Sequence, residues 1–410
     1  ALAVVFLFGL AYLSYGKVLA KFFDLKEGSP TPAIEKNDGI DFVPTPKTFL
    51  LGQHFSAIAA AGPIVGPILA SLWFGWLPVL LWIVAGAIFF GAVHDFSTLV
   101  GSVRHRAISI VEIVNEHFGR KGYLVFLLFV WLSLIYVITA FTDLTSNSFV
   151  DPKLGGGVAT SSLLYLVLGV LMGIGLYRFK LPLNIATLIF LPLVLLAIWL
   201  GPSFPLIWPS TSHFSSQQIW NGILLAYCFV ASVIPVWLLL QPRGYLGGFF
   251  LYVTLAMGII GLFIGGEKIQ YPAFIGFTSA KGLPLFPLLF VTVACGACSG
   301  FHGIVCSGTT SKQIAKEPDC RAVGYGGMLL EGLVAIVALS TVMILAPSDP
   351  LAATSPDRIY AEGLGRFVQH FGISQDFARS FTLLAFTTFI YDTLDVATRL
   401  ARYLFQELTG

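Results

Sequence analysis

Apolar residues form long runs along almost the whole chain, and short polar segments separate them. Each run has about 20 residues, the length of an α-helix that crosses a bilayer. The runs predict an all-α, polytopic membrane protein with about eleven transmembrane helices. Their expected ranges are 1–22, 48–72, 79–101, 122–143, 160–177, 182–200, 219–240, 246–265, 284–308, 323–346 and 378–399.

Composition supports this fold class and argues against a separate soluble domain. Of the 410 residues, 56% are hydrophobic and 11% are charged, whereas a soluble domain has about 25% charged residues. We therefore predict one transmembrane domain over residues 1–410. A cleavable signal over 1–22 is disfavoured because no small-residue cleavage site follows it. The sequence starts at Ala1 rather than Met, which leaves open further helices before residue 1 and after residue 410.

The distribution of basic residues predicts the orientation. If eleven helices alternate in direction, 17 of the 23 Lys and Arg residues fall on one side of the membrane and six on the other. By the positive-inside rule the richer side is cytoplasmic, which puts the start of the first helix outside. The loops on the richer side are 23–47, 102–121, 178–181 and 309–322.

The second helix is interrupted by the sequence GPIVGP, which contains Gly62, Pro63, Gly66 and Pro67. Proline lacks a backbone donor and clashes with the preceding turn, so an unbroken helix is not expected here. A break exposes backbone groups that bind ions or carboxylates. The alternative is a proline kink that only improves helix packing.

The seventh helix contains a second candidate break, ASVIP, with Ser232 and Pro235. Helices 2 and 7 are an odd number of helices apart, so they run in opposite directions. Paired broken helices of opposite direction are typical of a five-plus-five inverted repeat with a binding site at mid-membrane. We predict repeats over 48–200 and 219–399, with 1–22 as an extra helix.

Ionisable residues at membrane depth cost about 2.5–3.5 kcal/mol on insertion scales and therefore need a partner or a function. Asp395 and Arg399 are four residues apart, which predicts an internal ion pair, with a functional role as the alternative. Asp95 and Glu331 have no basic residue three or four positions away, which favours proton binding and release by one of them. The other candidates are His54, His94, Asp143, His302 and Asp392.

The ninth helix is the most polar, with the sequence CGACSGFHGIVCSGTTSK over 295–312. Cys295, Cys298, His302 and Cys306 suggest a zinc site, but a regular helix would spread them over about 16 Å. A metal is therefore not expected unless Gly296, Gly300 and Gly303 break the helix. The favoured interpretation is close packing against a broken helix, with Ser299 among the hydroxyl ligands.

Two loops are predicted to form helices outside the membrane. In 107–119 apolar residues lie opposite Glu112, Asn115 and Glu116, as in an amphipathic helix on the cytoplasmic surface. The outer loop 347–377 is expected to form a similar covering helix. The chain has no Walker A sequence, G-x-S-x-G elbow or H-E-x-x-H motif, which argues against an ATP-driven pump or a membrane hydrolase.

Several long motifs resemble the carbon starvation protein A family, also called the peptide transporter carbon starvation family. The matching stretches span the chain from residue 31 to its end, and the match is specific because long ungapped motifs recur in the family's order. The family usually has two histidines at the positions of Gln53 and His54, and a glutamine at that of His94. Many members continue for several helices beyond Gly410. The motifs are TPAIEKNDGIDFVPTPKTFLLGQHFSAIAAAGPIVGPILA, GAVHDF, ASVIPVWLLLQPRGYL, ACGACSGFHGIVCSGTTSKQIAKE, GYGGMLLEGLVAI and TLDVATRLARYLFQEL.

The resemblance implies secondary uptake of short peptides, or of pyruvate with protons, across the bacterial inner (plasma) membrane during carbon starvation. It also implies the LeuT-like five-plus-five fold. In that fold the first broken helix and the eighth of the ten hold a coupling cation, here around Ala59–Gly66 and Ser299–His302. The carry-over is one of architecture.

Together these observations predict a cation-coupled symporter, not an enzyme, that needs no cofactor, metal or nucleic acid. We expect its partners to be the lipid bilayer, a small carboxylate substrate and a proton, with sodium as the alternative. The rivals are a nutrient sensor without transport, a channel and a membrane enzyme. The coupling-ion candidates are Asp95, Ser299, His302 and Glu331; the substrate-binding candidates are Gln53, His54, Gly62, Pro63, Gly66, Pro67, Ser232, Pro235 and Gln241.

Overall fold

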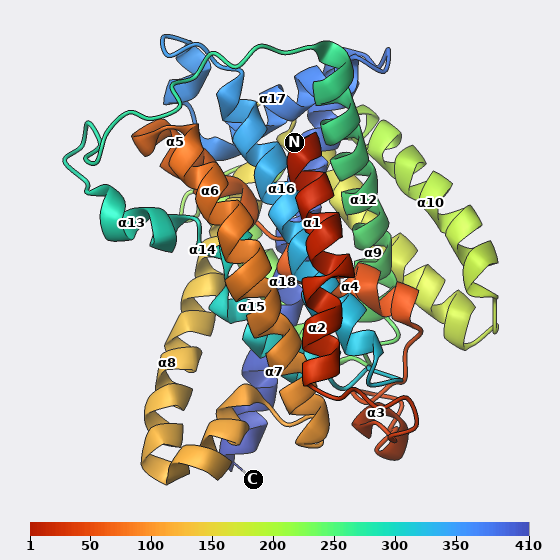
Figure 1. Ribbon diagram of the computed structural model, residues 1–410. Helices are drawn as coiled ribbons and strands as arrows, with labels where there is room; N and C mark the ends of the chain where they lie inside the picture. The colour runs from red at the N-terminus through yellow and green to blue at the C-terminus, as the bar shows by residue number, and fades with distance from the viewer. Residues whose placement is uncertain (410) are drawn as a thin grey trace.

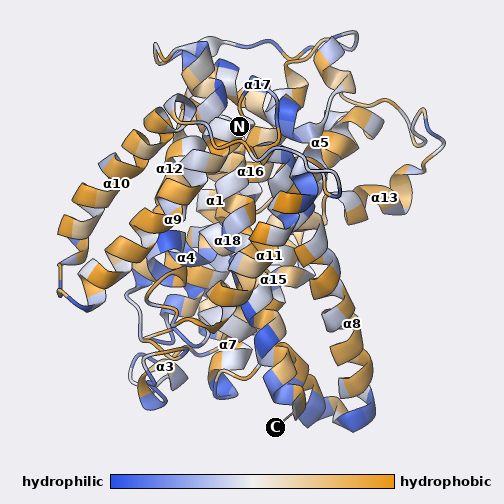
Figure 2. Cartoon of the chain, turned by 180° about the vertical axis from the view of Figure 1, so that it is seen from behind, coloured by the Kyte–Doolittle hydropathy of each residue, from blue (hydrophilic) through white to orange (hydrophobic). Residues whose placement is uncertain are grey.

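The computed structural model describes residues 1–409, which form a bundle of helices aligned roughly along one direction (Figure 1). The described residues hold no β-strand, only two isolated bridges. Hydrophobic side chains cover the middle of the bundle, and hydrophilic ones gather towards its ends (Figure 2). This distribution is typical of a protein whose central part lies in a lipid bilayer.

Among the described residues, seven helical segments are long and apolar enough to span a membrane, and a bent pair makes an eighth. The prediction of an all-α, polytopic membrane protein is therefore confirmed. The seven are α1–α2 (Leu2–Leu13 and Tyr15–Phe22), α6–η1–α7 (Trp76–Gly86, Ala87–Gly91 and Ala92–Arg104), α8 (Ile110–Phe149), α9 (Gly155–Tyr177), α10–η2 (Leu183–Leu200 and Gly201–Ser203), α12 (Leu240–Gly265) and η4–α16 (Arg321–Tyr325 and Gly326–Met343).

The bent pair is the predicted break in the second helix. α4 (Lys47–Ile58) ends at Ala59, whose ψ of 62° is not helical, and α5 (Gly62–Phe74) continues at an angle of 44°. Pro63 lies in the first turn of α5, where a missing N–H leaves no bond unmade. α4 packs closely on α12 because Gly52 and Gly248 have no side chains between the two backbones. The loop before α4 contains one short helix, α3 (Pro32–Glu35).

The prediction of a break inside the seventh helix is wrong. α11 (Ser216–Val233) ends one residue before Ile234, and the chain reverses over 234–239 into α12. α11 begins beside Asp143, near the end of α8, and α12 ends beside His370 on the same side of the bundle, so α11 and α12 run antiparallel. Pro235 therefore lies in a connection near the cytoplasmic loops, where Val236 N–H donates to the Ile40 carbonyl at 2.9 Å.

The ninth helix is interrupted, although one continuous run was expected. The chain forms α13 (Leu285–Thr292), α14 (Ala294–Ala297), α15 (Gly300–Val305) and the π-helix η3 (Cys306–Thr310). Cys298 and Ser299 between α14 and α15 are extended. α14 packs closely on α16, because a Cβ on Gly296 would lie 2.7 Å from Cβ of Ala335.

Both predicted helices outside the membrane are present. Gly119 has φ 74° and ψ 176°, so it separates the amphipathic part of α8, residues 110–118, from the long apolar part. On the outer side η5 (Pro350–Ala353) and α17 (Pro356–Gln369) cover the bundle (Figure 1). The last helix, α18 (Gln375–Thr409), then runs the length of the molecule. The buried core is continuous between α17, α18, α12 and α16.

Candidate functional site

Three ionisable side chains from three helices meet inside the bundle: Asp95 of α7, His302 of α15 and Glu331 of α16. Nδ1 of His302 lies 2.8 Å from Oδ2 of Asp95, and its Nε2 lies 2.9 Å from Oε2 of Glu331. All three are buried. One imidazole thus lies between two carboxyl groups, so the cluster can exchange protons within itself without contact to bulk water.

The two contacts of His302 differ in quality. Nδ1 has hydrogen-bond geometry to Asp95. Nε2 faces Glu331 at ion-pair distance without hydrogen-bond geometry, and both Glu331 carboxyl oxygens lack a hydrogen-bond partner among the described residues. A buried carboxylate without donors is costly, and protonation or a bound cation would relieve that cost. Glu331 is therefore the under-satisfied member of the cluster.

Two further histidines border this cluster. Nδ1 of His94 lies 2.9 Å from Oδ1 of Asp95, and the His94 side chain is 37% exposed. His54 on α4 is fully buried, and its Nδ1 lies 2.9 Å from Oγ1 of Thr310. His94 gives the buried Asp95 a neighbour that reaches solvent or lipid, whereas His54 faces the interior.

Three of the four coupling-ion candidates are therefore adjacent. Ser299 is the exception, because its hydroxyl lies 3.6 Å from Sγ of Cys295 and makes no contact with the carboxyl groups. A zinc site is not formed either. Although the helix is broken, the cysteines 295, 298 and 306 do not converge with His302 on one metal position in the described part of the chain. Both ring nitrogens of His302 face carboxyl groups instead.

The amino end of α5 in GPIVGP is covered by the broken ninth helix. A Cβ on Gly62 would meet Sγ of Cys295, and one on Gly66 would meet the Thr292 carbonyl oxygen. Pro63 and Pro67 face Gly296 in the same contact. These four predicted substrate-binding residues thus form a close helix contact in this conformation, and no ligand fits until α5 and α14 separate.

The predicted pair of Asp395 with Arg399 is not formed. Arg243 of α12 instead contacts Asp395 directly through Nη1, and its Nε lies 3.1 Å from Oδ1 of Asp392. All three side chains are buried. Arg243 was counted among the 17 basic residues on the predicted cytoplasmic side. In the structure α12 packs against α18, and this contact places Arg243 inside the bundle.

Hydroxyl groups and aromatic rings complete the surroundings of Arg243. The Tyr227 hydroxyl donates to Asp395 at 2.7 Å, and Ser56 beside the α4 break donates to Asp392. The Tyr391 ring centre lies 4.4 Å from the guanidinium carbon. Gln53 lines the same site, whose cavity of about 10 Å³ has room for one water molecule. A buried guanidinium between two carboxylates is a charged cluster that sequence reasoning missed, and its arginine could bind an anion only in place of one of the two acids.

Arg399 joins the reversal at 234–239 to the cytoplasmic surface. Its Nη2 donates to the carbonyl oxygens of Ala231 and Ile234 at 2.7 and 2.5 Å, and Nη1 lies 3.1 Å from Asp41. The ASVIP segment is thus the carboxyl end of α11, which attracts a cation, and not the amino end that was predicted to meet a carboxylate.

The remaining substrate-binding candidates lie around this reversal, apart from the others. The Ser232 hydroxyl donates to the Phe229 carbonyl of its own helix at 2.7 Å. Gln241 at the start of α12 bonds to Tyr177, Thr45 and Gln313. Both side chains therefore have structural partners, and the predicted site is divided among three places.

A family model described as carbon starvation protein CstA matches residues 1–360. The peptide transporter CstA of Bacillus subtilis (strain 168) is 32% identical over all of this chain, which covers 74% of that relative. The peptide transporter CstA of Escherichia coli (strain K12) is 37% identical over 88% of this chain. The pyruvate/proton symporter BtsT of the same strain is 36% identical over 86%. The chain spans about half the length of these two, 52% and 50%.

No solved structure matches the chain. The relatives are named as transporters, in agreement with the prediction that the chain is not an enzyme. Together with the apolar helices, they make this a multi-pass protein of the bacterial inner (plasma) membrane. The chain belongs to the carbon starvation protein CstA family.

Proposed function

We propose that the chain forms the core of a proton-coupled secondary transporter for a small carboxylate-bearing nutrient. The observation that carries this proposal is the buried Asp95–His302–Glu331 cluster. It joins α7 and α16 to the broken ninth helix, so the protonation of one carboxyl group changes the attraction between segments that must move. Sodium is the alternative ion, and Glu331 would be its main ligand.

The substrate class follows from the relatives' names, peptide transporter and pyruvate/proton symporter. Peptides and pyruvate share a carboxylate. Arg243 is a buried guanidinium that connects to the α4 break through Asp392 and Ser56. A substrate carboxylate that replaces Asp392 on Arg243 would keep the charge paired during transport. This assignment replaces the one to ASVIP.

We propose alternating access around the two interrupted crossings, α4–α5 and α13–α15. In this account α11, α13–α15 and α18 also cross the bilayer, which gives the predicted eleven crossings. The five-plus-five repeat over 48–200 and 219–399 remains a prediction. A charged outer cavity of about 690 Å³ next to Asp151, Asp357 and Arg358 offers an entrance from the outside.

The test is uptake of labelled pyruvate and of a labelled dipeptide into proteoliposomes under an imposed pH gradient, with and without sodium. We expect saturable uptake that the inward proton gradient accelerates. Glu331→Gln should abolish this acceleration but retain exchange of internal for external substrate, because the amide cannot release a proton. Glu267→Gln, at a partly exposed pair with His370 outside the proposed entrance cavity, is the control. Uptake that ignores both gradients would refute the coupling, and binding without uptake would favour a sensor.

A further inference from the structure

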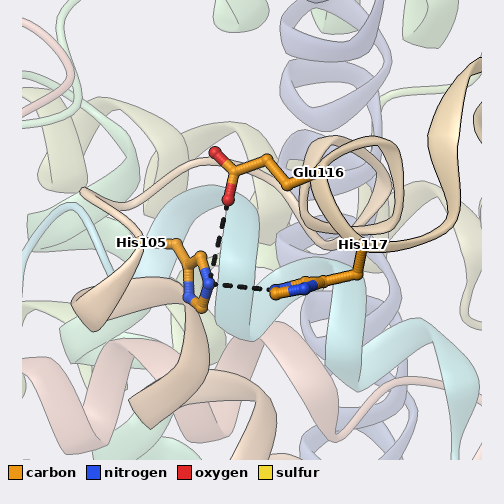
Figure 3. A group of neighbouring side chains, drawn as sticks. All are labelled: His105, Glu116 and His117. Atoms are coloured by element: carbon orange, nitrogen blue, oxygen red, sulfur yellow. Dashed lines mark hydrogen bonds and ion pairs between the residues drawn. The ribbon is translucent and has the colours of Figure 1, made fainter.

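A sharp turn between α7 and α8 brings together three side chains that have no part in the proposed transport site: His105, Glu116 and His117 (Figure 3). Nε2 of His105 lies 3.3 Å from Nε2 of His117 and 3.8 Å from Oε2 of Glu116. All three ligand atoms lie within 4.8 Å of one another. Two imidazole nitrogens and a carboxylate oxygen therefore point at one small volume.

The local backbone produces this arrangement. His105 follows the last residue of α7, and Arg106 and Ala107 have φ values of 60° and 56°, which reverse the chain direction. Ser109 then caps α8 by accepting from the Glu112 N–H at 3.2 Å. The amphipathic part of α8 thus returns towards the end of α7 with Glu116 and His117 on its polar face. The chain is helical on both sides of the turn.

Hydrogen bonding prepares His105 as a metal ligand. Its Nδ1 lies 2.7 Å from the Gly101 carbonyl oxygen, which can only accept, so Nδ1 carries the proton. In the neutral ring Nε2 then presents a lone pair towards the cluster. A carbonyl that fixes the ring in this way is the usual outer partner of a metal-bound histidine.

The distances fit a tetrahedral ion. With metal–nitrogen bonds of about 2.0–2.1 Å, two histidine nitrogens in a tetrahedral site are about 3.3 Å apart. The two Nε2 atoms have this separation before any ion is bound. Glu116 is half exposed, so its carboxylate can move closer to the two imidazole nitrogens, from which it is separated by no more than 4.8 Å. Without an ion, His117 would have to donate its own Nε2–H to His105.

We propose that His105, Glu116 and His117 bind a divalent transition-metal ion of the zinc type on the cytoplasmic surface, with water as a fourth ligand. Imidazole and carboxylate ligands suit zinc, cobalt and nickel. The ion would fasten the amphipathic segment 110–118 to α7, the helix that carries Asp95. Metal binding at this turn therefore stabilises one arrangement of α7 without entering the transport site.

The test is a cobalt titration of the full chain, purified in detergent and treated with chelator. We expect one Co²⁺ per chain with the visible absorption of a tetrahedral site, displaced by Zn²⁺. His105→Gln and His117→Gln should each weaken binding by roughly 10-fold to 100-fold, at least the effect of losing an outer partner. The matched control is His370→Gln, because His370 forms a His–Glu pair with Glu267 at 3.6 Å but lacks a second histidine.

A second measurement separates a site at this turn from adventitious binding. Zn²⁺ should slow hydrogen exchange of the amides in 110–118 in the wild type, and not in His117→Gln. Size-exclusion profiles of the variants should be unchanged, since the side chains lie at the surface. Equal Co²⁺ affinity in wild type and both variants, or no tetrahedral spectrum in the wild type, would overturn the proposal.

Discussion

His302 Nδ1 and Asp95 Oδ2 lie 2.8 Å apart, and neither side chain is more than 1% exposed. The contact links α15, part of the interrupted segment α13–α15, to α7, part of a continuous apolar span. Its partners can separate only if a charge is neutralised or another partner replaces it, because an isolated charge at this depth is very costly. The contact between His302 and Asp95 must therefore be neutralised or replaced before α15 can move away from α7.

Asp95→Asn should destabilise the protein. The amide keeps the shape of the carboxyl group but weakens its bonds to both His302 and His94. We expect the free energy of unfolding to fall by about 1–3 kcal/mol. Thermal unfolding in detergent measures this loss, and Asp143→Asn at the outer end of α8 is the control, since Asp143 bonds to Gln217 at an exposed site. Equal melting temperatures for the two variants would contradict the prediction.

Arg243→Gln should be more damaging, because it leaves Asp392 and Asp395 buried without a positive charge. Loss of one partner of a buried ion pair costs about 3–5 kcal/mol. Arg379→Gln, which opens a partly exposed pair with Glu362, should cost about 1 kcal/mol at most.

Changing the acids together with the arginine tests the cause of that loss. In Arg243→Gln combined with Asp392→Asn and Asp395→Asn, part of the lost stability should return, because no unpaired charge remains. Urea-dependent or thermal unfolding of the wild type, Arg243→Gln, the triple variant and the control Arg379→Gln would decide this. If the triple variant is less stable than Arg243→Gln alone, packing rather than charge explains the effect.

Gly66→Ala should destabilise the contact between α5 and α13–α14. The added methyl group meets the Thr292 carbonyl oxygen, and neither backbone can move without displacing its helix. Overpacking of this kind costs about 1–3 kcal/mol. Gly101→Ala is the matched control in α7, because nothing lies within 4 Å of its added Cβ. That variant should be neutral or up to about 1 kcal/mol more stable, and the difference in melting temperature gives the comparison.

Lys312, in the cytoplasmic loop after η3, should make stability depend on alkaline pH. Burial lowers the pKa of Lys312 to about 8, and the Asp41 carboxylate only partly opposes this. In the unfolded chain the pKa of lysine is about 10.4. Between these values the unfolded chain holds more protons than the folded protein, so stability rises with pH across this window. Below it the cost of burying the charge is fully present.

Melting curves from pH 7 to pH 10.5 check this sign. Lys312→Met should be more stable than the wild type at pH 7 and should lose the rise between about pH 8 and 10. Lys316→Met, in the same loop with an exposed side chain, should keep the wild-type profile. Because burial raises the pKa of the Cys320 thiol, which lowers stability at alkaline pH, the measure is the difference in stability between the wild type and Lys312→Met. A difference that falls across the window would show that the lysine is stabilised in its charged form.

The hydropathy pattern predicts the class of fold and the first break correctly, because apolar run length and proline position act locally. The prediction of a mid-membrane break at Pro235 is wrong for a related reason. A proline marks the end of a helix equally well in a broken span and in a reversal, and only the tertiary position of Gly265 beside His370 on the outer side decides between them. The break at Cys298 lies between Gly296 and Gly300, which the sequence marks as possible breakers but does not distinguish from glycines that only allow close packing.

Candidate site residues follow the same division. Asp95 and Glu331 stood out because they lacked a local partner, and the structure joins them through His302. Arg243 was assigned to a cytoplasmic loop, since a basic residue near the end of an apolar run is usually an interface anchor. The available signal was Asp392, which has no basic residue three or four positions away along α18. Long-range pairing hides such residues from an analysis of neighbours along the chain.

The thiol of Cys295 fills the position that a side chain on Gly62 would take. The thiol is partly exposed, and a thiol-reactive probe of low permeability should reach it faster when α5 and α14 have moved apart. The rate of its modification, measured from each side of the membrane, would thus report how often α5 and α14 separate towards that side. The native cysteine at this contact therefore allows the separation of α5 and α14 to be followed by thiol modification without an engineered cysteine.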